Sequence, residues 1–303
     1  MCLACVASTG PREVHPAPFP DAALPLPWPD GERAGGTLRW TGVAGILLEL
    51  DGVRIAFDPF VSRPGPLAVL LRRPRIDAAA VAAHFAELDA VFVGPTHYDH
   101  VMDVPEAMRV SPRATVHGSP TTVELLRRLG VDEARLRASR DGTVVEVGPF
   151  RVTAVASEHG VVPVVRHVDR IELPRKGLPW TPLRYPRGPV LAWRVQAGGR
   201  TFHVQGSAGI DEAALASQPP ADVVIACLAA RHGTERYLER LGAVLRPRIL
   251  MPCHHDHLMR PLAEPPRPVP GLDWPGFLAD ADDLATRWGT RLALPPFNRS
   301  IDW

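Results

Sequence analysis

Short runs of apolar residues alternate with stretches of helical periodicity along the chain. In its first patterned part, apolar spacing predicts strands at 37–41, 45–50, 53–57 and 90–94 and a helix at 77–88. The turn residues Asp51-Gly52 join two of these strands and are typical of a β-hairpin. The chain therefore starts with strands and adds a helix as it proceeds.

The same arrangement recurs toward the C-terminus. Further strands are predicted at 114–117, 143–147, 150–156, 190–196, 201–205, 223–228, 248–252 and 291–294, and further helices at 103–109, 119–129, 235–245 and 276–288. Because two strand-rich halves each gain helices, we expect an α/β fold of the αββα type, with two mixed sheets flanked by helices.

The domain organisation is predicted from proline, glycine and the lack of linkers. Residues 1–36 are rich in Pro and Gly and predict an irregular N-terminal lead-in. No internal linker divides 37–303, which we expect to form one domain. Within it, 160–189 is a long Pro-rich insertion with little periodicity.

Composition narrows the class of protein without naming a partner. The chain is 46% hydrophobic and 22% charged, and its formal net charge is +1, so no global charge predicts a nucleic-acid partner or an anionic membrane. The longest apolar runs are strand-length, well short of the roughly 18 residues that a membrane span needs. The N-terminus lacks the pattern of a secretory signal, and we expect a cytoplasmic location.

Four cysteines are too few for a disulfide scaffold in a chain of this length. Cys2 and Cys5 form a CxxC motif, but no second CxxC accompanies it. Cys227 and Cys253 lie in predicted strands. We expect none of the four to be catalytic.

Candidate metal ligands gather in Thr96-His97-Tyr98-Asp99-His100, directly after a predicted buried strand. Alternate side chains at a strand end point the same way, so His97 and Asp99 can face one pocket, and His100 can reach a neighbouring point. Imidazole and carboxylate without thiolate suit a borderline divalent ion, zinc foremost, while manganese or iron would also fit.

Two further histidines follow predicted strands elsewhere in the chain. His159 lies three residues after the end of 150–156, and His254 lies two residues after the end of 248–252. Three separate strand ends that each carry histidine indicate a site on one rim of a sheet sandwich. The alternative, three unrelated solvated or capping histidines, requires three coincidences.

Six sequence blocks support this interpretation by their order. They are Trp40 to Gly45, Phe57 to Phe60, Thr96 to His100, Ser157 to His159, Gln205 to Gly209, and His254 to Leu262. Their order and approximate spacing resemble the metallo-β-lactamase-fold hydrolases, in the branch near the ascorbate-lactonase-like and N-acyl-phosphatidylethanolamine phospholipase D-like members. The resemblance runs from about Leu38 to Leu294.

The resemblance implies a binuclear site with the signature His-x-His-x-Asp-His. Carried over, it implies that His97 and His159 serve a first metal and that Asp99, His100 and His254 serve a second. It also implies that Asp58 orients a ligand.

Two positions depart from the pattern of the family. The first signature histidine falls on Pro95, and the aspartate that bridges two metals in many relatives falls near Ser207. The first metal position then keeps two protein ligands, fewer than the three or so that zinc normally has. We therefore expect this position to be weak or empty, with His232, His255, His257 or Asp256 as candidates to fill the gaps.

The chemistry that follows is metal-dependent hydrolysis. A metal-bound hydroxide would attack an ester, lactone, amide or phosphodiester, and Asp99 or Asp256 could carry the proton to the leaving group. The alternative is a metal-impaired, non-hydrolytic binding protein on the same fold. The substrate is a small molecule, and it is anionic if the arginine-rich insertion at 160–189 contacts it; the competing interpretation is a solvated loop in an arginine-biased chain.

Overall fold

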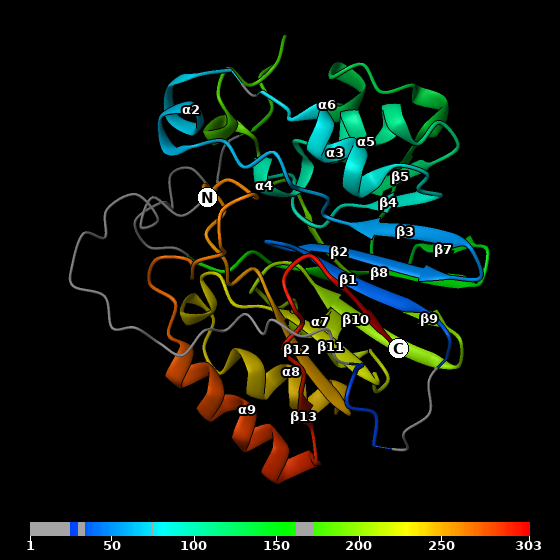
Figure 1. Ribbon diagram of the computed structural model, residues 1–303, viewed down its shortest axis with the longest axis vertical. Coiled ribbons are helices and arrows are strands. Elements are labelled where there is room, and N and C mark those ends of the chain that lie inside the picture. Colours follow the sequence, from blue (N-terminus) through cyan, green and yellow to red (C-terminus); the bar gives the residue numbers. More distant parts are fainter. Residues whose placement is uncertain (1–24, 30–33, 74, 162–171) are drawn as a thin grey trace.

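The computed structural model describes residues 25–29, 34–73, 75–161 and 172–303, and these residues form two facing sheets (Figure 1). The first sheet has the strand order β14 (Ser300–Asp302), β1 (Thr37–Gly42), β2 (Gly45–Leu50), β3 (Val53–Phe57), β4 (Ala90–Phe92), β5 (Thr115–Gly118) and β6 (Leu136–Ala138). The second has the order β13 (Arg291–Leu292), β12 (Ile249–Cys253), β11 (Val223–Cys227), β10 (Arg200–Gln205), β9 (Val190–Ala197), β8 (Phe150–Ser157) and β7 (Val144–Val147).

Helices cover the outer face of each sheet (Figure 1). Over the first sheet lie α3 (Ala78–Phe85), α5 (Val104–Val110) and α6 (Pro120–Arg128), and over the second lie α7 (Glu212–Ala216), α8 (Tyr237–Leu245) and α9 (Trp274–Trp288). Two further short helices, α2 (Pro66–Leu71) and α4 (Tyr98–Val101), follow strands β3 and β4. The predicted αββα sandwich of two mixed sheets is confirmed.

Local sequence signals explain where the longer helices begin. Ser119 caps α6 by accepting a hydrogen bond from the Thr122 N–H, with Pro120 at the first helical position. Asp273 caps α9 in the same way through the N–H of Gly276, and Gly289 ends that helix in a left-handed conformation. Because Asp273 is the cap, α9 begins two residues before the predicted start at 276.

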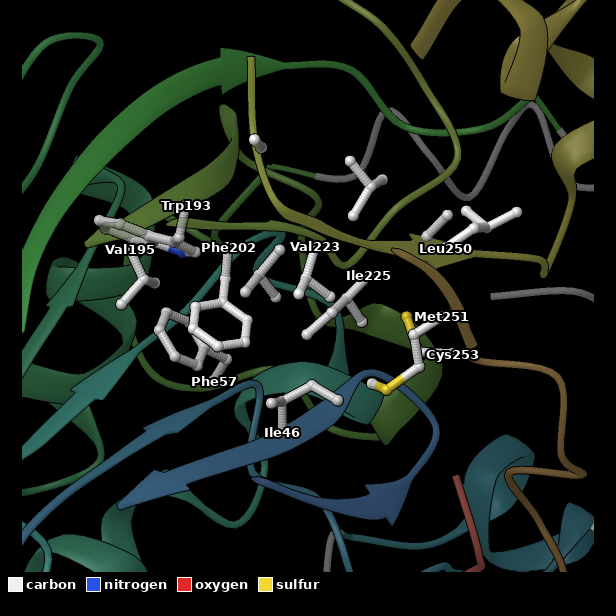
Figure 2. Packing of buried hydrophobic residues seen from close by; sticks show 14 of the residues in the cluster. Ile46, Phe57, Trp193, Val195, Phe202, Val223, Ile225, Leu250, Met251 and Cys253 are labelled. Atoms are coloured by element: carbon white, nitrogen blue, oxygen red, sulfur yellow. The ribbon is translucent and has the colours of Figure 1, made fainter. Parts of the chain in front are cut away.

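The main core lies between the two sheets. Figure 2 shows side chains of both sheets meeting there, among them Ile46 and Phe57 from the first and Phe202, Val223 and Ile225 from the second. A second cluster lies between the first sheet and its helices, with Val91 packed near Phe85 and Leu125. Both faces of the first sheet are therefore buried, which agrees with the unbroken apolar run of β4.

The ends of the chain contain features that the apolar pattern did not predict. Strand β14 pairs antiparallel with β1, and the Trp303 side chain is fully buried. Residues 25–29 and 34–36 of the predicted lead-in have no helix or strand, yet Leu26 and Trp28 are buried in the core. The rest of the lead-in, including Cys2 and Cys5, lies outside the described residues.

The directions of the strands determine which loops lie together at the edges of the two sheets. Strands β3 to β6 are parallel, as are β10 to β13, and β8 points in the direction of β10 because each is antiparallel to β9. The carboxyl ends of parallel strands meet at one edge of a sheet, where ligands bind in many α/β proteins. The segments after β3, β4, β8, β10, β11 and β12 therefore lie at shared edges.

A buried ion pair supports the turn between β1 and β2. Nη1 of Arg63 lies 2.6 Å from Oδ2 of Asp256, and Oδ1 of Asp256 accepts a hydrogen bond from the Val43 N–H at 2.7 Å. Both charged side chains are almost fully buried. Val43 has φ 50°, a strained value for a β-branched residue, and this hydrogen bond helps to hold it there.

We predict that Asp256→Asn lowers the free energy of unfolding by about 3–5 kcal/mol, because it leaves the Arg63 guanidinium buried without a counter-charge. Urea unfolding followed by circular dichroism measures the change. The exposed pair Arg151–Glu146 is the control, and Glu146→Gln should cost about 1 kcal/mol or less. Equal stability of Asp256→Asn and Glu146→Gln would contradict the prediction.

Candidate metal centre

Donor side chains from both sheets converge at the carboxyl ends of their strands. Strand β4 leads to His97, Asp99 and His100, β8 leads to His159, and β12 leads to His254. His97, Asp99, His100 and His254 are buried, and His159 is half-buried. The structure thus brings together the five residues that the sequence predicted as ligands, in two groups.

The first group consists of Asp99, His100 and His254. One donor atom of each residue lies within 4.8 Å of the donor atoms of the other two. Nε2 of His254 is 3.2 Å from Oδ2 of Asp99, and Nε2 of His100 is 3.9 Å from the same oxygen. Ligands about 2.0–2.2 Å from a shared zinc ion are separated by comparable distances, so these three residues fit a divalent cation.

The second group is the pair His97 and His159. Their ring centroids are 4.6 Å apart and the rings are nearly perpendicular. Desolvation lowers the pKa of His159 to about 3 and holds the pKa of His97 well below its usual value. Both rings are therefore neutral imidazoles, the form that binds metals.

The charged and titratable side chains of the first group shift one another's pKa values against the effect of burial. Burial alone would raise the pKa of Asp99, but His100 and the hydrogen bond with His254 hold it well below its ordinary value. Burial alone would lower the pKa of His100, but the carboxylates of Asp58 and Asp99 raise it. Asp99 is therefore ionised and available as an anionic ligand.

Asp58 orients the ring of His100 through the Nδ1 atom. Its Oδ2 is 3.0 Å from Nδ1 of His100, and its Oδ1 accepts a hydrogen bond from the Gly94 N–H at 2.7 Å. This contact fixes the ring so that Nε2 faces Asp99, the support that ligating histidines commonly receive. The contact between Asp58 and a ligand is the one that the sequence predicted.

Two glycines make room for the Asp58 carboxylate. A Cβ on Gly94 would lie 3.2 Å from Oδ2 of Asp58 and 3.0 Å from the Leu191 carbonyl oxygen. A Cβ on Gly206 would clash with the same carboxylate. These close approaches explain glycine at both positions.

The backbone of the ligand segment differs from the predicted strand end. His97 is extended and precedes α4, so Asp99 and His100 are successive residues of a helical turn. His254 has φ 54° and Asp58 has φ 44°, both in the left-handed region. Non-glycine residues adopt this conformation rarely and cluster at functional sites.

A pocket opens beside the first group. Its lining includes Asp99, His100, His159 and His254, the residues Gly206, Ser207 and Cys227, and a wall of mostly apolar residues from 228–230, Leu258 and 269–272. Sequence reasoning missed the segment 269–272, which carries no chemical motif. Burial raises the pKa of the Cys227 thiol, so it stays protonated.

Gln205 shapes the turn that contains Ser207. Its side-chain nitrogen donates hydrogen bonds to the carbonyl oxygens of Ser207, at 3.0 Å, and Gly209, at 2.7 Å. Oε1 of Gln205 lies 3.0 Å from Nε2 of the buried His203. The turn is thus held from within the second sheet.

Other residues considered as ligands or proton carriers lie away from the pocket lining. Both oxygens of Asp256 are engaged by Val43 and Arg63, so its role in proton transfer stays a prediction. His255 stacks on Trp40 with ring centroids 4.3 Å apart. His257 accepts a hydrogen bond from the Met259 N–H, and His232 lines a separate hollow beside α8 and α9.

The described residues of the insertion, 160–161 and 172–189, contribute none of the pocket lining. Arg166, Asp169 and Arg170 lie outside the described residues. Tyr185 is buried in the core, and Trp180 is 57% exposed.

A family model described as the beta-lactamase superfamily domain matches residues 53–261. The match includes Asp58 and all five predicted ligands, and it spans more than half of the chain. The chain belongs to this family. The predicted membership of the metallo-β-lactamase-fold superfamily is therefore confirmed.

Solved structures share the fold of this superfamily member at low sequence identity. Igni18, a metallo hydrolase from Ignicoccus hospitalis, has a TM-score of 0.56 and 15% identity, covering 88% of this chain and 98% of that one. YhfI from Bacillus subtilis, a metallo-beta-lactamase fold protein, has a TM-score of 0.55 and 13% identity, covering 90% of this chain and 100% of that one. CmlA, a diiron beta-hydroxylase from Streptomyces venezuelae, has a TM-score of 0.58 and 15% identity, covering 89% of this chain and 54% of that one.

Curated relatives are more similar in sequence over a shorter stretch. Uncharacterized proteins of Mycobacterium tuberculosis and Mycobacterium bovis are 31% identical over 159 residues. The match covers 48% of this chain and 40% of each relative, so it spans less than half of either protein.

We predict that Asp58→Asn weakens zinc binding by roughly 10–100-fold, because the ring of His100 loses the carboxylate that orients it. Competition between the metal-free protein and a zinc chelator measures the affinity. Asp89→Asn is the control, since Asp89 also accepts a backbone hydrogen bond, from Arg54, away from the pocket. Unchanged zinc affinity in Asp58→Asn, or an equal loss in Asp89→Asn, would count against this role.

Proposed function

We propose that the chain is a metal-dependent hydrolase whose working cation is held by Asp99, His100 and His254. The observation that carries this proposal is the convergence of three buried donors within 4.8 Å of one another. Membership of the beta-lactamase superfamily and the similarity of the fold to metallo-hydrolases support it.

Zinc is the cation that this donor set favours. Two imidazoles and a carboxylate that line a pocket match the ligands of catalytic zinc sites. Manganese and iron accept the same ligand types, and CmlA shows that this fold can serve a diiron protein.

A divalent cation in such a site lowers the pKa of water and polarises a carbonyl or phosphoryl oxygen. The residues of the chain supply the rest. Asp58 holds His100 through Nδ1, which leaves Nε2 directed at the site. Oδ1 of Asp99 accepts no hydrogen bond from the described residues, and it is the atom that we assign to receive a proton from water and return it to the leaving group.

The pocket walls suit a substrate with an apolar portion. Leu228, Leu258 and Val269 line the pocket together with the ligands and give it an apolar wall. An ester, lactone, amide or phosphodiester linkage at the cation is the reaction class that we infer.

A single cation is the form that we propose. Pro95 stands where the signature of the family places its first histidine, and proline offers no side-chain donor. His97 and His159 are then two neutral imidazoles without a third protein ligand from that position, fewer than zinc usually has.

We predict that His100→Ala loses its bound zinc and lowers hydrolysis by more than about 100-fold, because water is no longer activated. Initial rates on a panel of esters, lactones, amides and phosphodiesters measure the activity, and elemental analysis measures the metal. His84→Gln is the control, since this half-buried imidazole bonds Asn298 away from the pocket. A wild-type protein that folds but takes up no zinc, manganese or iron would favour the non-hydrolytic binding protein instead.

We predict that Pro95→His raises the zinc content from about one to about two equivalents, because the new imidazole joins His97 and His159. Elemental analysis after dialysis measures the change. Pro95→Ala, which removes the ring without adding a donor, should stay at one equivalent. A zinc content of Pro95→His equal to that of Pro95→Ala would show that this position does not correspond to the first signature histidine.

A further inference from the structure

Exposed apolar side chains gather in two segments at one end of the molecule. Five of the eight large apolar side chains that the described residues leave exposed are Leu67, Leu71, Ile76, Leu178 and Trp180. The most exposed are Leu67 at 69%, Leu71 at 63% and Trp180 at 57%. The first three residues belong to α2 and the chain that follows it, and the last two belong to the insertion.

The outer side of helix α2 carries two exposed leucines, Leu67 and Leu71. Leu67 and Leu71 are four residues apart and share one helix face, while Val69 points the other way and is fully buried. A helix that is apolar on all sides is normally enclosed by protein. Here the outer face meets solvent.

The two segments lie next to each other. Helix α2 contacts the 3-10 turn η3 (Pro182–Arg184) of the insertion, and Figure 1 shows them at the same end of the molecule. The insertion is anchored, because Arg128 donates hydrogen bonds to the carbonyl oxygens of Pro174 and Gly177. We call Leu67, Leu71, Ile76, Leu178 and Trp180, together with the cations around them, the apolar–basic surface.

Exposed cations are interleaved with these apolar residues. Arg72 and Arg73 follow Leu71 directly, and Lys176 precedes Leu178 by two residues. The exposed cations of the surface are Arg72, Arg73, Arg75, Arg175, Lys176 and Arg184, against two exposed carboxylates, Asp77 and Glu172. None of these cations forms an ion pair with a carboxylate of the described residues.

The combination fits one kind of partner. Leucine and tryptophan side chains enter the boundary between headgroups and acyl chains, while neighbouring arginine and lysine side chains bind lipid phosphates and carboxylates. An acidic protein would satisfy the cations but would not require two leucines and a tryptophan to project into solvent. We propose that the apolar–basic surface docks the protein on an anionic lipid bilayer.

The overall charge of the chain conceals this feature. A net charge of +1 gives no sign of membrane affinity, because the surface is local. No helix among the described residues is long and apolar enough to cross a bilayer. The proposal therefore concerns peripheral contact, in which the protein lies on the lipid.

Docking would also orient the metal centre. Helix α2 follows β3, which leads to Asp58, and the insertion leads into β9, whose first residue lies at the same edge. The Thr96 N–H, in the ligand segment, donates a hydrogen bond to the Arg187 carbonyl oxygen at 2.7 Å. The surface and the metal centre thus share one edge of the sandwich, and the proposal stands whether or not the site hydrolyses anything.

Sedimentation with lipid vesicles tests the proposal on the full chain. We expect wild-type protein to bind vesicles of phosphatidylcholine and phosphatidylserine in equal parts, with much weaker binding to phosphatidylcholine alone and at high salt. Leu67→Ser with Leu71→Ser, and separately Arg72→Gln with Arg73→Gln, should each weaken binding roughly tenfold or more.

Matched variants keep the test specific. Leu278→Ser removes an exposed leucine from α9, and Arg113→Gln with Arg140→Gln removes two exposed arginines elsewhere; these variants should bind as wild type does. Circular dichroism confirms that each variant folds. Absence of wild-type binding to the mixed vesicles, or equal losses in the controls, would overturn the proposal. Analytical ultracentrifugation tests the other occupant. If the wild-type protein binds no vesicles but self-associates, and Leu67→Ser with Leu71→Ser abolishes this self-association, the surface binds a second copy of the chain instead.

Discussion

A buried row of carboxylates and imidazoles, Asp58, His100, Asp99 and His254, is the interaction on which the site depends. Each charge in it faces an opposite or hydrogen-bonding neighbour, at 3.0 Å, 3.9 Å and 3.2 Å along the row. Isolated charges are costly away from water, so the row holds only while every member is present. Because its members follow β3, β4 and β12, it also joins the two sheets at the edge where the pocket opens.

Much of the fold and the ligand set could be predicted because both follow from local patterns. Strands such as β2 and β9 are recognisable by their mostly apolar residues, and donors such as His159 and His254 lie within two residues of a strand end. Parallel strand ends meet in space, so ligands far apart in sequence converge. In contrast, helix α2 is too short to show helical periodicity in the sequence. Strand β14 depends on pairing with the edge of β1, which is distant in sequence.

The different contacts of the Asp58 and Asp256 side chains were harder to predict from the sequence. Asp256 lies two residues after a predicted ligand, and its role as a proton carrier stays a prediction; its carboxylate contacts Val43 and Arg63. The reason is backbone conformation: His254 adopts φ 54°, which redirects the chain after β12. A left-handed residue other than glycine leaves no signature in the sequence, so the direction of the side chains beyond it could not be predicted.

The pairing of β14 with β1 sets the order in which the molecule can be completed. During translation the outer edge of β1 stays unpaired by β14 until residues 300–302 leave the ribosome. An open strand edge invites pairing with other chains. The outer edge of β1 therefore stays open while the residues between β1 and β14 are synthesised, and chaperone contact at β1 would be most useful during that interval.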